Sequence, residues 1–233
     1  MLITSPVISA GSGSIAGLTM SHNRGGMYLR SRAVPTNPNS TEQQAVRNAM
    51  SFLAAYWRNT LTELQRDAWT VYGANTAMVN KLGAQVFLTG QQQFIRTNVP
   101  RLQNAGLTVN SLIVVAPTTY NLGNLTPCSI GAVDASDGDF EVNYDNTDDW
   151  ATVVGSGLLV YASRPQDPSI NFFRGPYRFA GEVAGDTVPP TSPATIELPF
   201  AVTAGQKVFF RLRASRLDGR LSADQFLVQT VTA

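Results

Sequence analysis

The chain has 233 residues, of which 43% are hydrophobic and 14% are charged, and its formal net charge is +1. This composition is too apolar for a disordered chain, and its apolar runs are too interrupted for a membrane span. The single cysteine, Cys128, excludes an internal disulfide and a cysteine-based zinc site, so we expect a buried thiol. The length allows one large domain or two modest ones, and we predict two domains preceded by an arm.

The small net charge hides an uneven distribution along the chain. Residues 1–110 contain nine basic and three acidic residues, a net charge of +6. Residues 111–233 contain eight basic and thirteen acidic residues, a net charge of −5. A basic front and an acidic back could support head-to-tail self-association or an anionic partner for the front. Two solvated faces of unequal charge are an equally simple interpretation.

Residues 1–39 are predicted to form an extended arm with a β-hairpin. The start lacks the charged and apolar pattern of a secretory signal, which favours synthesis in a cytoplasm. Two short strands, 12–21 and 27–32, flank a turn whose Asn and Gly residues tolerate positive φ. An isolated hairpin is marginal in water, so we expect this one to lie against its own domains or a neighbouring subunit.

The second strand of this hairpin supplies the first candidate binding residues. Tyr28, Arg30 and Arg32 fall on one face by the two-residue period of a strand. Arginine has a planar, charged fork that pairs with carboxylates. We therefore predict that these three residues bind a partner.

Residues 40–106 are predicted to form a small helical domain. The first helix begins after Ser40, which with Gln43 fits a capping box. The third helix is expected over residues 89–105, where Pro100 would kink or split it. Between the second and third helices, the segment 74–88 could be a turn or a short strand. The residues expected to face the core in these two helices are Ala45, Ala49, Phe52, Leu53 and Tyr56 in the first, and Phe94, Ile95, Asn98 and Leu102 in the third.

The second helix is predicted over residues 62–72, with Gly73 as its stop. Thr62 and Gln65 match a second capping box. The apolar stripe expected to face the core consists of Leu64, Ala68, Val71 and Tyr72.

Residues 107–233 are predicted to form an antiparallel β-sandwich of immunoglobulin or fibronectin type III topology. From about Leu112 the apolar pattern changes to short runs separated by turn signals such as Asp137-Gly138 and Asp218-Gly219. Seven or eight strands in this length are what such a sandwich needs. The expected strands are 112–116, a segment near 127–133, 140–144, 157–162, 177–180, 195–200, 207–214 and 226–231.

The strand at 207–214 supplies the second set of candidate binding residues. Val208, Phe210 and Leu212 are expected to point into the core. The alternate residues would then form an outward contact stripe with one aromatic ring and two cations. These predicted partner-binding residues are Phe209, Arg211 and Arg213.

Several motifs, spread over most of the chain, resemble those of one family. They are Gly17 to Arg32 with Pro35-Thr36-Asn37-Pro38, Gln43-Gln44-Ala45-Val46-Arg47, Trp57, Leu64-Gln65-Arg66-Asp67-Ala68-Trp69, the segment Gly90 to Gly106 with Phe94, Asn98 and Arg101-Leu102, and Phe210-Arg211-Leu212-Arg213-Ala214. On these residues the chain resembles a family of structural-region proteins encoded by tailed bacteriophages and prophages. These motifs mark positions in a fold, and none carries chemistry. The resemblance implies a virion structural component that is assembled in the host cytoplasm.

The candidate chemical groups do not combine into a reaction centre. His22, the only histidine, lies in a glycine-rich turn, where a catalytic triad would need an improbable convergence. The arm glycines do not satisfy GxGxxG, and no lysine follows them. Trp57 and Trp69 could form a sugar or base platform, but their helical positions favour packing between helices. We therefore predict a protein that is not an enzyme and needs no cofactor.

A calcium site in the acidic loops is a further possibility that the sequence raises. The loops hold oxygen ligands but lack EF-hand spacing and its terminal glutamate, so solvated turn aspartates and no metal site are the simpler prediction. The aspartates concerned are Asp134, Asp137, Asp139, Asp145, Asp148 and Asp149.

These observations lead to one expected function and two alternatives. We expect a virion protein that decorates or cements the capsid, forms a homo-oligomer or lattice, and binds neighbouring subunits through its arm and helices. The first alternative is a tail or neck component whose sandwich binds carbohydrate or a partner. The second is nucleic-acid binding by the basic half, which is less favoured because its cations are spread out and not interleaved with aromatic residues. No membrane partner is expected.

Overall fold

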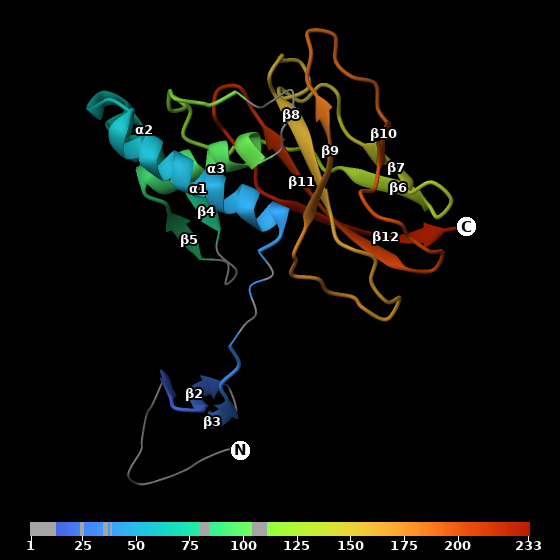
Figure 1. The fold of residues 1–233 in the computed structure, drawn as a ribbon. Helices are drawn as coiled ribbons and strands as arrows, with labels where there is room; N and C mark the ends of the chain where they lie inside the picture. The colour runs from blue at the N-terminus through green and yellow to red at the C-terminus, as the bar shows by residue number, and fades with distance from the viewer. Residues whose placement is uncertain (1–12, 24–25, 35–36, 38, 80–83, 104–110) are drawn as a thin grey trace. The chain divides into compact units, whose positions relative to one another are not determined.

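The computed structural model describes residues 13–23, 26–34, 37, 39–79, 84–103 and 111–233. It divides into two compact units, Met1–Thr41 and Glu42–Ala233, which are described separately below. Over the described residues the fold is α+β, with three helices and a large, mostly antiparallel sheet (Figure 1). The α+β class predicted from the sequence is therefore confirmed.

The first unit contains a small antiparallel sheet. Its strands are β1 (Gly13–Ile15), β2 (Leu18–Asn23) and β3 (Gly26–Ser31), in the order β1-β2-β3. The hairpin predicted from strands 12–21 and 27–32 is confirmed, with β2 paired to β3 over residues 18–23 and 26–31. The first predicted strand is divided by a turn at Ala16, whose φ is +53°.

Three helices begin the second unit, with a short hairpin between the last two. They are α1 (Thr41–Asn59), α2 (Glu63–Asn75) and α3 (Gly90–Gln103). The Thr62 hydroxyl accepts from Gln65 N, and the Gln65 side chain accepts from Thr62 N, as the capping box predicts. The segment left open by the sequence pairs β4 (Ala77–Val79) with β5 (Gln85–Phe87). Residues 90–103 form one helix despite Pro100, and its predicted end at residue 105 lies outside the described residues.

The helices pack around Phe94. The Trp57 and Trp69 rings lie 5.7 Å and 5.6 Å from the Phe94 ring, between their centroids, so the predicted packing role of both tryptophans is confirmed. Of the other core positions predicted in α1 and α3, Ala49, Leu53 and Asn98 are buried and Phe52 is half exposed. The remaining predicted positions are partly buried: Ala45, Tyr56, Ile95 and Leu102. The buried cluster comprises Leu53, Leu61, Trp69, Tyr72, Phe94, Ile113 and Ala116.

The strand predicted at residues 112–116 is wrong. The backbone of this segment bonds to helix side chains instead of to a strand: Asn98 Oδ1 accepts from Ile113 N at 2.7 Å, and Trp69 Nε1 donates to Val114 O at 3.0 Å. The side chain of Ile113 is buried in the helical cluster. The apolar run therefore reflects burial against helices, because buried backbone groups need only some partner, which side chains supply here.

The core-facing side predicted for α2 is also wrong, except at Tyr72. The buried residues of α2 are Trp69, Tyr72 and Gly73, whereas Leu64 is 81% exposed and Val71 is 47% exposed. Gly73 does not end the helix, which continues to Asn75. A Cβ at Gly73 would overlap the carbonyl oxygen of Leu88, so this position serves close packing of α2 against the chain before α3.

Seven strands form the large sheet, in the order β10-β7-β6-β12-β11-β8-β9. All pairs are antiparallel except β12 with β6, which are parallel at Val231↔Val133 and Thr232↔Asp134. The two edge strands, β9 and β10, approach each other at Gly181 and Ile196. A Cβ added to Gly181 would lie 2.8 Å from Cγ2 of Ile196, so the glycine permits this close approach. The strands are β6 (Ser129–Asp134), β7 (Asp139–Asn143), β8 (Gly157–Ala162), β9 (Arg178–Ala184), β10 (Ala194–Glu197), β11 (Lys207–Ser215) and β12 (Gln225–Thr232). Each overlaps a predicted strand.

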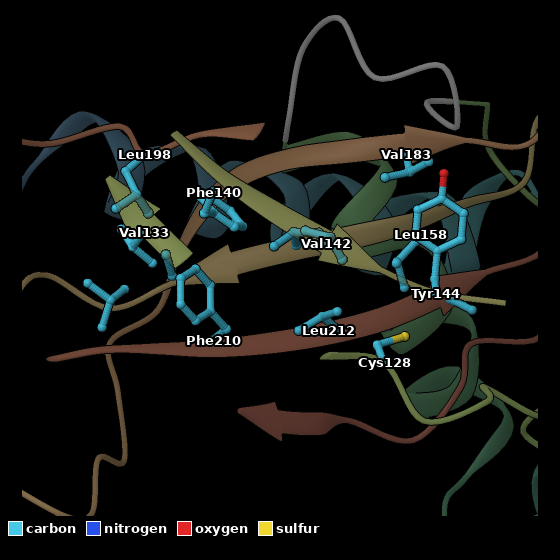
Figure 2. Packing of buried hydrophobic residues seen from close by; sticks show 14 of the residues in the cluster. Cys128, Val133, Phe140, Val142, Tyr144, Leu158, Val183, Leu198, Phe210 and Leu212 are labelled. Atoms are coloured by element: carbon cyan, nitrogen blue, oxygen red, sulfur yellow. The ribbon is translucent and has the colours of Figure 1, made fainter. Parts of the chain in front are cut away.

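The inside of this curved sheet holds the larger core (Figure 2). Phe140 of β7 and Phe210 of β11 meet with ring centroids 4.8 Å apart. Cys128 is a free thiol that is 7% exposed, so the predicted buried thiol is confirmed. Burial, and secondarily the charge of Asp148, raises its pKa to about 11.

Helix α3 is fixed to the loop between β11 and β12 by side chains that donate to backbone carbonyls. Arg96 donates to Leu221 O at 2.9 Å and to Ser222 O at 2.8 Å. Arg101, which is 1% exposed, donates to Arg216 O at 2.7 Å. These bonds join the helical part to the sheet within the second unit. The predicted domain boundary between residues 106 and 107 lies outside the described residues.

Candidate protein-binding surfaces

The side chains of strand β11 point alternately into the core and to the opposite face of the sheet. Val208, Phe210 and Leu212 are fully buried in the larger core, as predicted. The alternate side chains lie on the outer face, because successive side chains of a strand point to opposite sides. These are the predicted partner-binding residues Phe209, Arg211 and Arg213.

A second layer of aromatic rings covers Phe209. This residue is 6% exposed and stacks on Phe173, with ring centroids 5.6 Å apart and an interplanar angle of 22°. Phe173 in turn meets Tyr177 edge-on at 5.2 Å. The chain between β8 and β9 therefore folds over the outer face of β11, and Phe209 forms the floor of a surface and not an exposed contact.

Arg211 lies between two tyrosine rings. Its guanidinium carbon is 4.5 Å from the Tyr161 ring centre and 5.4 Å from that of Tyr177. Its Nε atom is buried without a hydrogen-bond partner among the described residues. Burial and then the neighbouring charge of Arg213 lower the pKa of Arg211. Arg211 forms no ion pair with a carboxylate of the described residues, although the charge of Asp224 acts on it from nearby.

Arg213 is neutralised locally. Its Nη2 donates to Asp224 Oδ2 at 2.9 Å, and its Nε bonds the other carboxylate oxygen, which makes a bidentate ion pair. Burial lowers the pKa of Arg213, but the hydrogen bond and charge of Asp224 outweigh it and raise the pKa overall. Arg213 therefore stabilises the β11–β12 end of the sheet.

The outer face of β11 and β12 and the segment before β9 enclose a pocket of about 550 Å³, here called the aromatic groove. Phe226 of β12 pairs across the sheet with Arg211, and Val228 pairs with Phe209. Phe226 is 61% exposed and Phe172 is 69% exposed, so apolar rings form much of the accessible wall. The lining residues are Asn171, Phe172, Phe173, Arg174, Tyr177, Phe209, Phe226, Leu227 and Val228.

Arg174 provides an exposed cation at the rim of the aromatic groove. Its guanidinium carbon lies 5.2 Å from the Phe172 ring centre. It forms no ion pair with any carboxylate of the described residues. At the same rim, Lys207 Nζ donates to Asn171 Oδ1 at 2.9 Å. The groove is therefore apolar with a basic border, which suits an apolar partner that carries carboxylates.

The other three predicted binding residues belong to the first unit. Tyr28 is half-buried and pairs with Ser21, whereas Arg30 is exposed and pairs with Thr19. Arg32 follows β3 directly, is exposed, and donates its backbone N–H to Gly17 O at 2.8 Å. The six predicted residues thus form two groups, one in each unit.

The acidic loops form local turns. Asp134 accepts from both the backbone and the hydroxyl of Ser136, and Asp145 accepts in the same way from Thr147. Asp149 pairs with Arg216 and Arg220. Across the described part of the chain, no three His, Cys, Asp or Glu side chains converge on a common point that could hold a metal. The side chain of His22 lies outside the described residues.

Residues 171–177 complete the groove and were not among the binding residues predicted from the sequence. Three aromatic residues, Phe172, Phe173 and Tyr177, lie within six positions of the sequence. Gly175-Pro176 separates the two phenylalanines from the tyrosine. Such a density of aromatic rings in a turn-rich segment is the signal that could have indicated a surface cluster. Their contact with β11 could not be read from the strand alone.

Comparison of the chain with family models, with curated proteins and with solved structures finds no match. None of the helices in the described ranges is long and apolar enough to cross a membrane.

Proposed function

We propose that this chain is a structural protein of a tailed-bacteriophage virion and that its first unit binds neighbouring subunits. The observation that carries the proposal is the first unit itself, a separate sheet of short strands with exposed apolar side chains. Ile15 is 77% exposed and Leu18 is 52% exposed. A sheet this small buries too little apolar surface to be stable alone, so a partner surface would stabilise it.

The chemistry of the first unit indicates the kind of partner. Its outer strands, β1 and β3, each have an edge that can accept an added strand. No acidic residue precedes Glu42, whereas Arg30 and Arg32 are exposed. Arginine forks favour carboxylates in partly desolvated contacts. The proposed partners are therefore acidic surfaces of other virion proteins, in a homo-oligomer or lattice.

Within this proposal the second unit is the displayed body of the protein. Its seven-stranded sheet would be a sandwich of immunoglobulin or fibronectin type III kind, held outward by the helices. An extended binding unit joined to such a body suits capsid decoration, in which one subunit spans neighbours in a lattice. The protein would be made in the host cytoplasm and incorporated into the virion.

The aromatic groove favours a second candidate, a tail or neck component whose sheet domain binds carbohydrate or a protein partner. Exposed rings such as Phe172 and Phe226 can stack on apolar faces of a ligand. Immunogold labelling of intact particles would separate head from tail, and a glycan array would detect carbohydrate binding.

The virion role is tested by deleting residues 1–32. We expect the truncated chain to fold but to be absent from purified particles, whereas the full chain occurs at a fixed stoichiometry measured by mass spectrometry. The reason is that the first unit provides the proposed lattice contact. Normal incorporation of the truncated chain would contradict this role.

A charge-reversal pair refines the same test. Arg30→Glu with Arg32→Glu should reduce incorporation, whereas Arg47→Glu with Arg58→Glu, two exposed positions of α1, should leave it unchanged. If nucleic acid were the partner, the chain would bind DNA in an electrophoretic mobility-shift assay with a steep dependence on salt. Both double variants would then weaken this binding to a similar degree.

A further inference from the structure

Helix α2 presents an apolar stripe to the outside although its other side already fills the helical core. Leu64, Ala68 and Val71, here called the α2 stripe, are all exposed. They follow the i, i+4, i+7 spacing that aligns side chains on one face, and Leu64 and Val71 are separated by about 10 Å along the axis. This is the stripe that the sequence pattern assigned to the core. A stripe with the spacing of a buried face is suited to burial in a partner.

One edge of the α2 stripe is acidic. Glu63 and Asp67 are exposed and one helical turn apart. Within the described residues neither forms an ion pair. The nearest cation in sequence, Arg66, is directed back to the carbonyl oxygen of Leu61 at 2.9 Å. The stripe therefore carries an uncompensated negative edge.

The aromatic groove has the complementary character. Its accessible wall is made of Phe172, Phe226 and Val228, and its volume of about 550 Å³ can take two aliphatic side chains. Arg174 at the rim and Arg211 beside the floor form no ion pair with carboxylates of the described residues. The groove therefore carries an uncompensated positive edge.

We propose that the α2 stripe of one copy docks into the aromatic groove of a second copy, with Glu63 and Asp67 facing Arg174 and Arg211. Placing an amphipathic helix in an apolar groove is a common mode of recognition. The contact joins two different surfaces, so it is head-to-tail and can repeat into a ring or an open array. This inference rests on the proposed assembly function and specifies one of its contacts.

Charge distinguishes this occupant from the other candidates. The first unit also exposes apolar side chains, but it would bring Arg30 and Arg32 against Arg174. Carbohydrate, a ligand considered for the second candidate function, is a poorer match than the α2 stripe. It needs several polar partners for its hydroxyl groups, whereas only Asn171, Arg174 and Tyr177 bring polar side-chain atoms to the lining. The aliphatic side chains of the α2 stripe suit the apolar lining of the groove. The negative charge of its acidic edge is complementary to the positive charge of the border.

Sedimentation velocity of the full chain over a concentration series tests the contact. Leu64→Asp and, separately, Arg174→Glu should each weaken self-association by about tenfold or more, because each removes a part of the complementarity. Val188→Asp is the matched control, since Val188 is exposed and lies outside both surfaces. All of the altered positions are exposed, so circular dichroism and thermal unfolding should remain unchanged.

A charge-swap variant provides the decisive measurement. Arg174→Glu combined with Glu63→Arg, which leaves Asp67 opposite Arg211, should restore self-association toward the level of the unaltered chain. High salt should weaken the association of both chains. Failure of this restoration, a Leu64→Asp chain that associates as well as Val188→Asp, or an unaltered chain that stays monomeric throughout would each overturn the proposal. Loss of association only when residues 1–32 are deleted would assign the groove to the first unit instead.

The outcomes also separate this contact from the virion role. Incorporation into particles without α2-dependent association would overturn the docking contact alone. Association through α2 without incorporation would overturn the virion role alone.

Discussion

At the scale of single residues, Arg101 shows how a buried cation joins parts of this molecule. Its guanidinium donates to Arg216 O at 2.7 Å and to Ser111 O at 3.2 Å. Burial lowers its pKa to about 10, so the group remains charged at neutral pH. Arg101 of α3 therefore bonds backbone carbonyls of two segments that are far apart in the sequence, and it connects both segments to the helix.

Replacing Arg101 with alanine should lower the free energy of unfolding by about 3 kcal/mol, because it leaves buried carbonyls unpaired and a cavity beside α3. Urea unfolding would measure this change. Arg58→Ala, at an exposed position of α1, should change it by less than about 0.5 kcal/mol. Equal effects of the two substitutions would contradict the connecting role.

The buried thiol of Cys128 predicts a dependence of stability on alkaline pH. Its pKa is raised from 9.0 to about 11 by burial, so the unfolded chain loses this proton first. Stability is therefore unaffected by this group below pH 9, where the thiol is protonated in both states, and it falls by up to about 3 kcal/mol as the pH rises through 9 toward 11. Urea unfolding across this range should show a flatter profile for Cys128→Ala. Parallel profiles would show that the thiol does not contribute.

At the scale of elements, α2 packs against the start of α3 through glycines at both contacts. A Cβ at Gly90 would lie 2.6 Å from Thr70 N, and one at Gly73 would overlap the Leu88 carbonyl oxygen. The chain can approach this closely only where a side chain is absent. The position of α3, and so of its arginines, depends on this contact.

Gly73→Ala should destabilise the protein by about 2 kcal/mol, since the clash with backbone outweighs the gain of about 1 kcal/mol in helix propensity. Thermal and urea unfolding would measure it. Ala68→Gly, at an exposed position of the same helix, gives the size of the propensity effect alone. A stabilised Gly73→Ala chain would show that the close approach can relax.

The strands were predictable because their period is short and their ends carry turn residues. Gly138 and Gly219 have φ values of +81° and +95°, as the Asp-Gly turns suggested. The pattern failed at 112–116, where an apolar run packs on helices, and on α2, where two faces are each apolar enough to be buried. Periodicity reports that a face is apolar but not what covers it.

The candidate site was predictable only in part for a related reason. The two-residue period placed Phe209 and Arg211 on the outer face correctly. It could not show that Phe173 stacks on Phe209 or that Arg211 lies between Tyr161 and Tyr177. These contacts depend on how the long connection between β8 and β9 folds back, which no local pattern encodes.

At the scale of the whole molecule, two compact units of very different size share one chain. If the first unit acts only in binding, the truncated chain that lacks residues 1–32 should unfold with the same midpoint as the full chain. The reason is that the residues of both hydrophobic cores, such as Trp69 and Phe210, belong to the second unit. Calorimetry would measure both midpoints, and a clear decrease on truncation would show that the first unit also supports the body.

The place of β12 in the sheet sets the order in which this body can be built during translation. β12 follows every other strand in the sequence but lies between β6 and β11. Until it emerges, β6 and β11 have open edges that can pair with other nascent chains. Chaperones that shield strand edges should therefore raise the yield of folded protein during rapid synthesis.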